Sequence, residues 1–447
     1  MTDSQPGQEG TPDGRDRFIP IRKADILDAL IDHGAIADAE NRGKFREICR
    51  IMAAIYHFEY FELLEKLRHA YFYFDPGLGR RPDFDPATLD LAYKELVDSL
   101  SAVLKGANFD DVPPQEVGRA HSESAIVRVA LSAPVEEFRE VRFFRRGQHR
   151  ETVTARRWFG LRKKQVETEV YDDVILFVAM KTLEEFASKR QRKRVLRRQI
   201  RPGSIIIKYF RNIAKTDLNA LYPNARVVMT TFDKWFLAVP AVAGAIPILL
   251  NLSSTIVVLF LVVGFYLGIT AAIEENHLKT AFAALSGLIA LGGFIARQWF
   301  KYKNRALEHL MEVTDKIYFR NINNNAGIFD TVIGAAEDQE CKEAFLAYYF
   351  LITAREPPTQ EEVDRRIEGW ILETFRIDLN FEVDDALGKL DRLGLLRRDG
   401  ERLSVPGPDQ TLERLDYVWD NYFQYNKPEA QVERVSGCRM GGAITRL

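Results

Sequence analysis

The sequence predicts an α+β membrane protein, with folded parts before and after an apolar block in the chain. Three observations predict this class: helical spacing of apolar residues near the N-terminus, strand-like alternation in the middle, and two long runs without charge. A chain of 447 residues is long enough for several domains. Its average composition, 46% hydrophobic and 28% charged, excludes collagen-like and largely disordered classes.

The N-terminal region, residues 18–112, is expected to be helical. It follows a polar, Gly- and Pro-rich tail at 1–17, which is typical of disorder and has the pattern of neither a signal peptide nor a transit peptide. Apolar residues recur at helical spacing over 21–40 and 44–74. A third helix is predicted over 86–106, because it begins with a proline and ends with a glycine.

Residues 119–234 are predicted to form a basic domain built on an antiparallel β-sheet. Several stretches alternate between apolar and polar residues or are rich in Val, Phe and Tyr, and Gly147 and Gly160 lie in two of the gaps between them. Hairpin connections follow from the short gaps. The predicted strands are 125–131, 137–146, 151–157, 165–180 and 204–209.

Two uncharged runs predict a membrane segment. No Asp, Glu, Lys, Arg or His occurs from Trp235 to Ile273, nor from Thr280 to Ala296. A bilayer core needs about 20 apolar helical residues, so these runs are long enough to span it. Neither run carries an internal charge of the kind that proton relays and ion-coupled transporters use.

The predicted membrane segment, residues 235–299, is a two-helix hairpin with spans at about 252–273 and 280–299 and a lead-in at 235–251. Basic residues flank both ends, so both folded regions are expected in the cytoplasm, at a bacterial-type cytoplasmic membrane. Three spans, which would place the two regions on opposite sides, are the alternative. Small residues spaced for close helix packing, within the hairpin or in a homo-oligomer, are Gly264, Gly268, Ala272, Ala283, Gly287, Gly292 and Ala296.

A connecting helix and an Asn-rich turn are expected over residues 300–336. The turn has two interpretations. It can bind a ligand, with Asn323, Asn324, Asn325 and Gly327 as candidates, or it can be a capped helix–helix junction.

The C-terminal region, residues 337–425, has the predicted element order of a winged helix and precedes a second disordered tail at 426–447. Three helices are followed by two short strands around Asp399-Gly400, a strong hairpin signal. Residues 337–420 hold 21 acidic and 11 basic residues, a net charge of -10. Because DNA binding needs Lys and Arg to neutralise phosphates, this charge favours a protein-interaction module, and nucleic acid is not the expected partner.

A basic patch concentrates the positive charge of the chain. Residues 139–215 hold 22 basic and 8 acidic residues, so their net charge is +14 while the rest of the chain carries -16. Three interpretations stay open: contact with anionic lipid headgroups of a bilayer, pairing with the acidic C-terminal domain, and a solvated or nucleic-acid-binding face. The candidate residues are Arg156, Arg157, Trp158, Phe159, Arg162, Lys163, Lys164, Lys189, Arg190, Arg192, Lys193, Arg194, Arg197, Arg198 and Arg201.

No familiar catalytic motif occurs in the sequence. Phosphate-loop, dinucleotide-binding, HExxH and GxSxG patterns are missing, and the seven His residues do not cluster. The three Cys residues lie far apart, which argues against a zinc site, so no metal and no cofactor are expected. The main hypothesis is a membrane-anchored, non-enzymatic interaction or scaffold protein. An enzyme acting on a lipid or membrane-borne substrate and an oligomeric channel or transporter are the alternatives.

Four stretches occur in a specific order: IIIKYFRNIAKTDLNALYPNARVVMTTFDK (205–234), ALSGLIALGGFIARQWFKYKNR (284–305), YFRNINNNAGIFD (318–330) and ECKEAFLAYYF (340–350). In this combination the chain resembles the transmembrane protein 143-like family of membrane proteins of unknown function, over about residues 120–425. The resemblance implies a membrane-embedded protein. It implies no activity and no catalytic residues, because the family supplies none.

Overall fold

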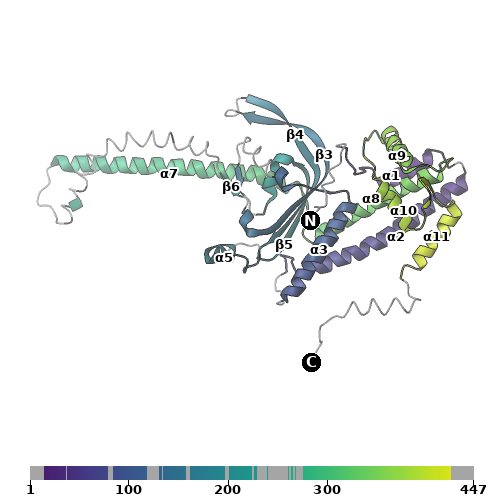
Figure 1. The fold of residues 1–447 in the computed structure, drawn as a ribbon. Coiled ribbons are helices and arrows are strands. Elements are labelled where there is room, and N and C mark those ends of the chain that lie inside the picture. Colours follow the sequence, from purple (N-terminus) through teal and green to yellow (C-terminus); the bar gives the residue numbers. More distant parts are fainter. Residues whose placement is uncertain are drawn as a thin grey trace, which may run out of the picture. The chain divides into compact units, whose positions relative to one another are not determined.

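The computed structural model describes residues 15–36, 38–78, 84–117, 130–132, 134–157, 162–196, 201–223, 226–228 and 275–423, with a few single residues between 239 and 267. The chain divides into two compact units (Figure 1). Unit 1 combines Met1–Asp110 with Asn323–Leu447, and unit 2 is Asp111–Ile322. The N-terminal helices and the C-terminal region, which the sequence predicts as separate domains, therefore belong to one unit.

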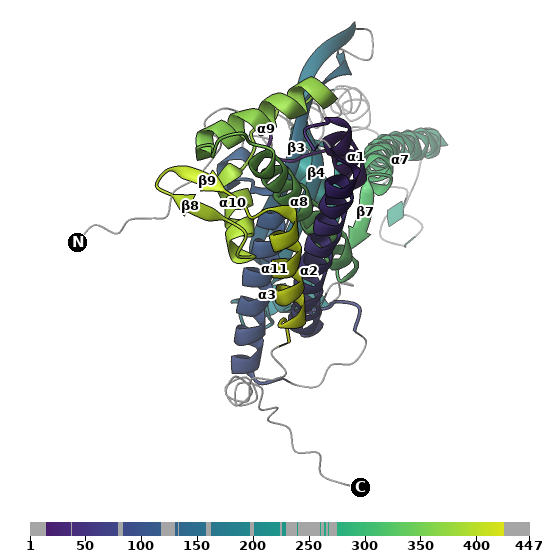
Figure 2. The ribbon, with the colours of Figure 1, turned by 90° about the vertical axis from the view of Figure 1, so that its right-hand side faces the viewer.

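Unit 1 is helical and has α8 at its centre, where it packs against α1, α2, α3, α9 and α10 (Figure 2). Its apolar core mixes both ends of the chain, since Phe45 and Met52 lie in one cluster with Tyr348 and Leu387. Side-chain caps fix two helix starts: Asp38 accepts a hydrogen bond from the Asn41 amide, and Thr359 forms a reciprocal capping box with Glu362. The helices are α1 (Lys23–Asp32), α2 (Ala39–Phe72), α3 (Pro86–Gly106), α8 (Gly327–Ile352), α9 (Gln360–Phe375), α10 (Val383–Arg392) and α11 (Pro408–Asp420).

The last part of unit 1 has the order of elements that was predicted for a winged helix. Helices α8, α9 and α10 are followed by the antiparallel pair β8 (Arg397–Asp399) and β9 (Arg402–Ser404). Gly400 lies in the turn between them with a φ of 60°, which a glycine adopts at low cost. The segment before α9 extends this small sheet, because Thr359 pairs with Arg402 and the Leu403 amide donates to the Pro358 carbonyl at 2.9 Å.

Unit 2 is built on an antiparallel sheet in which β4 (Arg162–Met180) lies between β3 (Phe138–Arg157) and β5 (Ile205–Ala214). Alternate residues of the strands bury one face, where Phe143, Leu176 and Phe210 pack together. The full strand order is β1-β3-β4-β5-β7. The edge strands β1 (Asp110–Asp111) and β7 (Asn321–Asn324) lie where the chain passes between the units. The other elements are β2 (Ala130–Ser132), which pairs with β6 (Arg226–Val228), the 3₁₀ turns η2 (Val135–Glu137) and η3 (Lys215–Leu221), and α5 (Lys189–Leu196).

The β3 strand is longer than predicted. Two separate strands were expected around Gly147, but β3 passes through this residue, which has a φ of 67°. A Cβ atom here would come within 2.3 Å of the Asp172 carboxylate on β4, so only glycine fits without rearrangement.

The α7 helix (Glu275–Tyr318) corrects the predicted membrane segment. It is 44 residues long, begins inside the expected hairpin connector and continues past the expected second span at 280–299 into a charged stretch that includes Arg297, Lys301 and Glu308. The uncharged run is thus one part of a longer helix whose remaining length is polar.

Among the described residues, no helix is both long enough and apolar enough to cross a membrane. This finding contradicts the predicted transmembrane hairpin, and with it the membrane part of the predicted fold class and the predicted location in a bacterial cytoplasmic membrane. The α+β character and the antiparallel sheet are present. The expected first span at 252–273 and the lead-in at 235–251 lie almost wholly outside the described residues.

Candidate functional site

The predicted basic patch falls on two elements of unit 2. Strands β3 and β4 pair up to their ends, so Arg156 lies opposite Lys163 and Arg157 opposite Arg162, while Lys164 pairs with Ala155. The hairpin tip with Trp158 and Phe159, and the pair Arg197 and Arg198, lie outside the described residues. The other candidates are Lys189, Arg190, Arg192, Lys193 and Arg194, which are in α5, and Arg201, which follows it.

Helix α5 holds exposed cations on a small apolar anchor. Val195 and the preceding Phe186 are buried, while Lys189, Arg192 and Lys193 are exposed. The Arg192 Nε donates to the Phe186 carbonyl at 3.1 Å, which ties the helix to its preceding turn. No carboxylate within the described part of unit 2 forms an ion pair with these three side chains, so their charge faces solvent.

The small residues predicted for membrane helix packing are partly described. Ala283, Gly287, Gly292 and Ala296 belong to α7, and Gly292 and Ala296 are exposed. Gly264 is one of the isolated described residues, whereas Gly268 and Ala272 lie outside them.

The Asn-rich turn links β7 to α8 through its own side chains. The Asn323 amide nitrogen donates to the Gly327 carbonyl at 2.6 Å and to the Thr331 hydroxyl at 3.2 Å, and its oxygen accepts from the Asn324 amide. Asn325 has a φ of 52° and its carbonyl accepts the Ile328 amide at the start of α8. Asn323 and the Asn325 carbonyl therefore help to hold the start of α8.

The third helix of the winged-helix arrangement, α10, exposes carboxylates. Asp384, Asp385 and Asp391 are exposed, whereas Lys389 is buried. The Asp384 carboxylate accepts from the Gln360 amide at 2.5 Å. In a DNA-binding winged helix this helix offers donors and cations to the groove. Here its outer face is acidic.

Lys389 is the centre of a buried charge cluster between α8 and α10. Its ammonium group forms ion pairs with Glu343, with Asp385 at 2.8 Å and with Glu340 at 3.4 Å. The side chains of Lys389 and Glu343 are both 3% exposed. The Asn108 amide donates to the other oxygen of Glu343 at 3.3 Å, so this carboxylate is satisfied on both sides.

Carboxylates outnumber cations in the cluster, which shifts its pKa values. Burial raises the pKa of Glu343 to about 7, against the opposing charge of Lys389. Burial likewise raises the pKa of Glu340. Burial alone would lower the pKa of Lys389, but Glu343, Glu340 and Asp385 raise it, so the lysine stays charged. One ammonium therefore faces more than one carboxylate, and the raised pKa of Glu343 reflects this excess of buried negative charge.

Helix α2 closes the cluster on its outer side. Arg392 of α10 lies 3.5 Å from Glu59 and 3.7 Å from Glu340, and it packs over the ring of Tyr56 at 5.8 Å. Burial raises the pKa of Glu59, opposed by Arg392. Both cations of α10 thus pair with carboxylates of unit 1, although the Arg392 side chain is 56% exposed.

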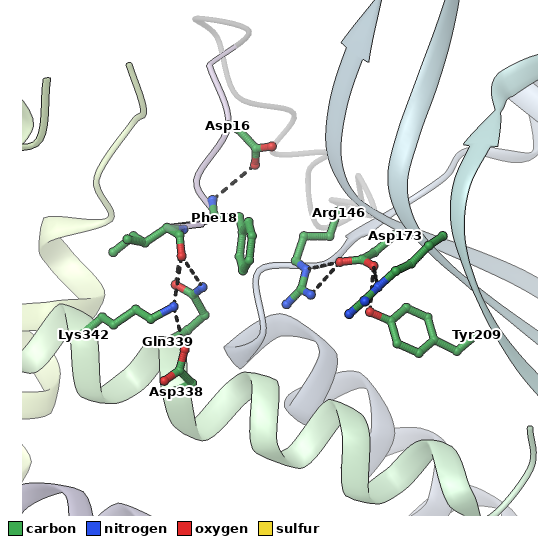
Figure 3. A network of polar contacts seen from close by, with 10 residues as sticks. Asp16, Phe18, Arg146, Asp173, Tyr209, Asp338, Gln339 and Lys342 are labelled. Atoms are coloured by element: carbon green, nitrogen blue, oxygen red, sulfur yellow. Dashed lines mark hydrogen bonds and ion pairs between the residues drawn. The ribbon is translucent and has the colours of Figure 1, made fainter. Parts of the chain in front are cut away.

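The N-terminal segment is fastened to unit 1 beside this cluster. The Ile19 carbonyl accepts from Gln339 at 3.1 Å and from Lys342 at 3.0 Å, and Lys342 also pairs with Asp338 at 2.6 Å (Figure 3). Arg17 pairs with Glu382 at 2.6 Å and also with Asp110. The bonds to Gln339, Lys342 and Glu382 join residues more than 300 positions apart in sequence.

Unit 2 has its own buried ion pair on β3 and β4. The Asp173 carboxylate accepts from Arg146 at 2.6 Å, from the Tyr209 hydroxyl at 2.7 Å and from Arg211 at 3.2 Å (Figure 3). Burial, with the neighbouring Asp173 charge, raises the pKa of Tyr209 to about 12. All three donors hold the carboxylate in place, which is the pattern of a structural network.

The Lys389 cluster was not predicted from the sequence, although a signal is present. Glu343 directly precedes the apolar run AFLAYYFLI (344–352) of α8, and a charge buried beside such a run needs a partner. The partner itself could not be found without the packing of α10. Among the described residues, no group of His, Cys, Asp or Glu is arranged to hold a metal ion.

Residues 171–327 match a family described as "Protein of unknown function (DUF3754)". The match runs from β4 through β5 and α7 to the first residue of α8, which is less than half of the chain. The chain is therefore similar to this family over most of unit 2, and the description attaches no activity to it. No solved structure matches the chain.

Proposed function

We propose that this protein is a binding or scaffold protein whose winged-helix-like part contacts a basic partner protein. The observation that carries this proposal is the charge of α10. Lys389 is buried among carboxylates and Arg392 is directed at Glu59, while Asp384 and Asp391 are exposed. The helix that would read DNA in other winged helices therefore offers negative charge to a partner.

Charge complementarity favours a protein ligand over a nucleic acid at this face. DNA binding depends on Lys and Arg that neutralise phosphates, and repulsion between α10 and phosphates would oppose it. A Lys- or Arg-rich protein segment has the opposite charge. The resemblance to a membrane-protein family of unknown function adds no ligand to this proposal.

The test compares two fluorescent probes, a lysine-rich peptide and a short DNA duplex, by anisotropy with the full chain. Replacing Asp384 and Asp391 with Asn should weaken peptide binding several-fold, since exposed charge pairs contribute about 0.2–1 kcal/mol each. DNA binding through other surfaces should stay unchanged. The matched control replaces Glu361 and Glu373 on α9, which are also exposed, with Gln. Equal effects of the two pairs, or stronger DNA binding than peptide binding through α10, would refute the proposal.

A second candidate function is supported by α5. Its exposed Lys189, Arg192 and Lys193, beside the exposed Leu196, suit contact with anionic lipid headgroups at a bilayer surface. Each cation near such a surface contributes about 1 kcal/mol, so replacing Lys189 and Lys193 with Gln should weaken binding to anionic vesicles about tenfold or more. Replacing Lys94 and Lys105 of α3 is the control. Equal co-sedimentation with neutral and anionic vesicles would refute this candidate.

A further inference from the structure

An exposed aromatic cluster lies where α11 packs along α2 (Figure 2). Phe58 is at its centre, with ring centroids 4.8 Å from Tyr422, 4.9 Å from Phe423 and 6.3 Å from Phe61. Phe61 is 49% exposed and Phe423 is 67% exposed. Trp419, one turn before Phe423, is 45% exposed. Several large apolar side chains therefore face solvent at one place on unit 1.

Carboxylates border this cluster. Glu62 follows Phe61 on α2, and Asp416 and Asp420 lie on α11. All three are exposed, and within the described ranges none of them forms an ion pair. Glu65, a further carboxylate on this part of α2, differs from them because it pairs with Arg68 at 3.0 Å. The aromatic cluster thus has an acidic border with free charge.

The acidic border continues to the α10 face. Glu59 directly follows Phe58, and its carboxylate is the one that Arg392 approaches from α10. The aromatic cluster and the exposed carboxylates of α10 therefore belong to adjoining elements of unit 1.

We propose that the aromatic cluster of α2 and α11 is the docking site for an amphipathic helix of a partner protein, with an apolar face and flanking Lys or Arg residues. The apolar face would cover Phe61 and Phe423, and the basic flanks would pair with Glu62, Asp416 and Asp420. Both features are those of amphipathic-helix recognition, where apolar anchors supply most of the affinity and charges set the choice of partner. This inference rests on the proposed function and adds the binding surface and the partner's secondary structure.

The test uses a labelled model helix of Leu and Lys as the probe, with its apolar residues on one face. A peptide of the same composition in scrambled order, and a Leu and Glu version, are the comparison probes. The variant carries Phe61→Ser and Phe423→Ser, and the control is Leu372→Ser, at an exposed apolar position of α9 (46% exposed). Circular dichroism checks that each variant is folded.

The Phe61→Ser and Phe423→Ser variant should bind the Leu and Lys helix about tenfold more weakly, while Leu372→Ser should change its Kd by less than about twofold. The scrambled and the acidic peptides should bind wild type more weakly than the model helix. Unchanged affinity of the aromatic variant overturns the inference. So does equal binding of the scrambled peptide, because charge alone would then explain it.

Two further outcomes separate this inference from the proposed function. If the Asp384 and Asp391 variant loses peptide binding but the aromatic variant does not, the proposed function stands and the aromatic docking site fails. If neither variant changes binding, both fail. Sedimentation of the free protein tests whether a second copy of the chain occupies the aromatic cluster. A dimer that dissociates in the aromatic variant would show that the cluster serves self-association, and would overturn the proposal of a partner helix.

Discussion

Replacing Lys389 with Met tests whether the buried charge cluster stabilises unit 1. Methionine keeps a long apolar stem but removes the ammonium group that pairs with Glu343, Asp385 and Glu340. Glu343 then stays almost fully buried without a cation. Removing one partner of a buried ion pair costs about 3–5 kcal/mol, so we expect a loss of that size in the free energy of unfolding at about pH 8.

The loss should depend on pH in a definite direction. The folded pKa of Glu343 is about 7, above its ordinary value of 4.5. A carboxyl group with a raised folded pKa binds its proton more tightly in the folded state, so stability is present at low pH and falls as pH rises through the folded pKa. Without Lys389 this pKa rises further. The Lys389→Met variant should therefore recover part of its stability at about pH 5.5, where Glu343 is protonated.

Urea unfolding at about pH 5.5 and about pH 8 measures this effect, and hydrogen exchange of α8 amides assigns the transition to unit 1. Lys94→Met, on the exposed surface of α3, is the control. Adding Glu343→Gln to Lys389→Met should restore most of the stability, because a neutral pair is left. A loss below about 1 kcal/mol, or the same loss at both pH values, would refute the role given to the cluster.

Three other predictions follow from the fold. Asp173→Ala should destabilise unit 2 by about 3–5 kcal/mol, because the buried Arg146 loses its carboxylate partner. Asp172→Ala, at an exposed site, is the control and should cost under about 1 kcal/mol. Urea unfolding measures both changes. Thr359→Ala should cost about 1 kcal/mol by removing the cap of α9, and Thr359→Ser should retain most of it. Cys49 and Cys341 are buried and burial raises both thiol pKa values, so in a Cys438→Ser background a thiol reagent should label them only on unfolding; rapid labelling of that variant in its native state would contradict their burial.

Local patterns in the sequence predicted several elements of the fold. The helix expected from Pro86 to Gly106 has these bounds in α3, and the hairpin signal at Asp399-Gly400 lies between β8 and β9. In each case the deciding residues are neighbours in the chain. A proline fixes the start of a helix and a glycine permits a turn, whatever the rest of the molecule does.

Elements that depend on distant contacts were not predicted. Helix α5 was not expected, because its charged sequence has little apolar periodicity and its only described apolar anchor inside the helix is Val195. Helix α8 begins at Gly327, inside the segment 300–336 that was expected to hold a connecting helix and an Asn-rich turn, and before the expected start of the C-terminal region at residue 337. Considered by itself, the uncharged run at 280–296 predicted a membrane span. In the structure it is part of α7, which continues past it into charged residues.

The candidate surface could be predicted only in part. Acidic charge in the last domain is visible in the composition, but the engagement of Lys389 and Arg392 depends on α8 and α2, which lie far from α10 in sequence. The aromatic cluster likewise joins Phe58 to Phe423. A single sequence gives no means of pairing such distant positions.

The discontinuity of unit 1 determines when the protein can fold during its synthesis. Phe45 and Met52 leave the ribosome early, but Tyr348, Leu387 and Leu415, which complete the same core, are made last. The apolar side of α2 therefore stays uncovered during most of translation and is a target for chaperones or for aggregation until then. A chain that stops before α11 would also lack the face formed with α2, so the proposed docking site would exist only on fully translated molecules.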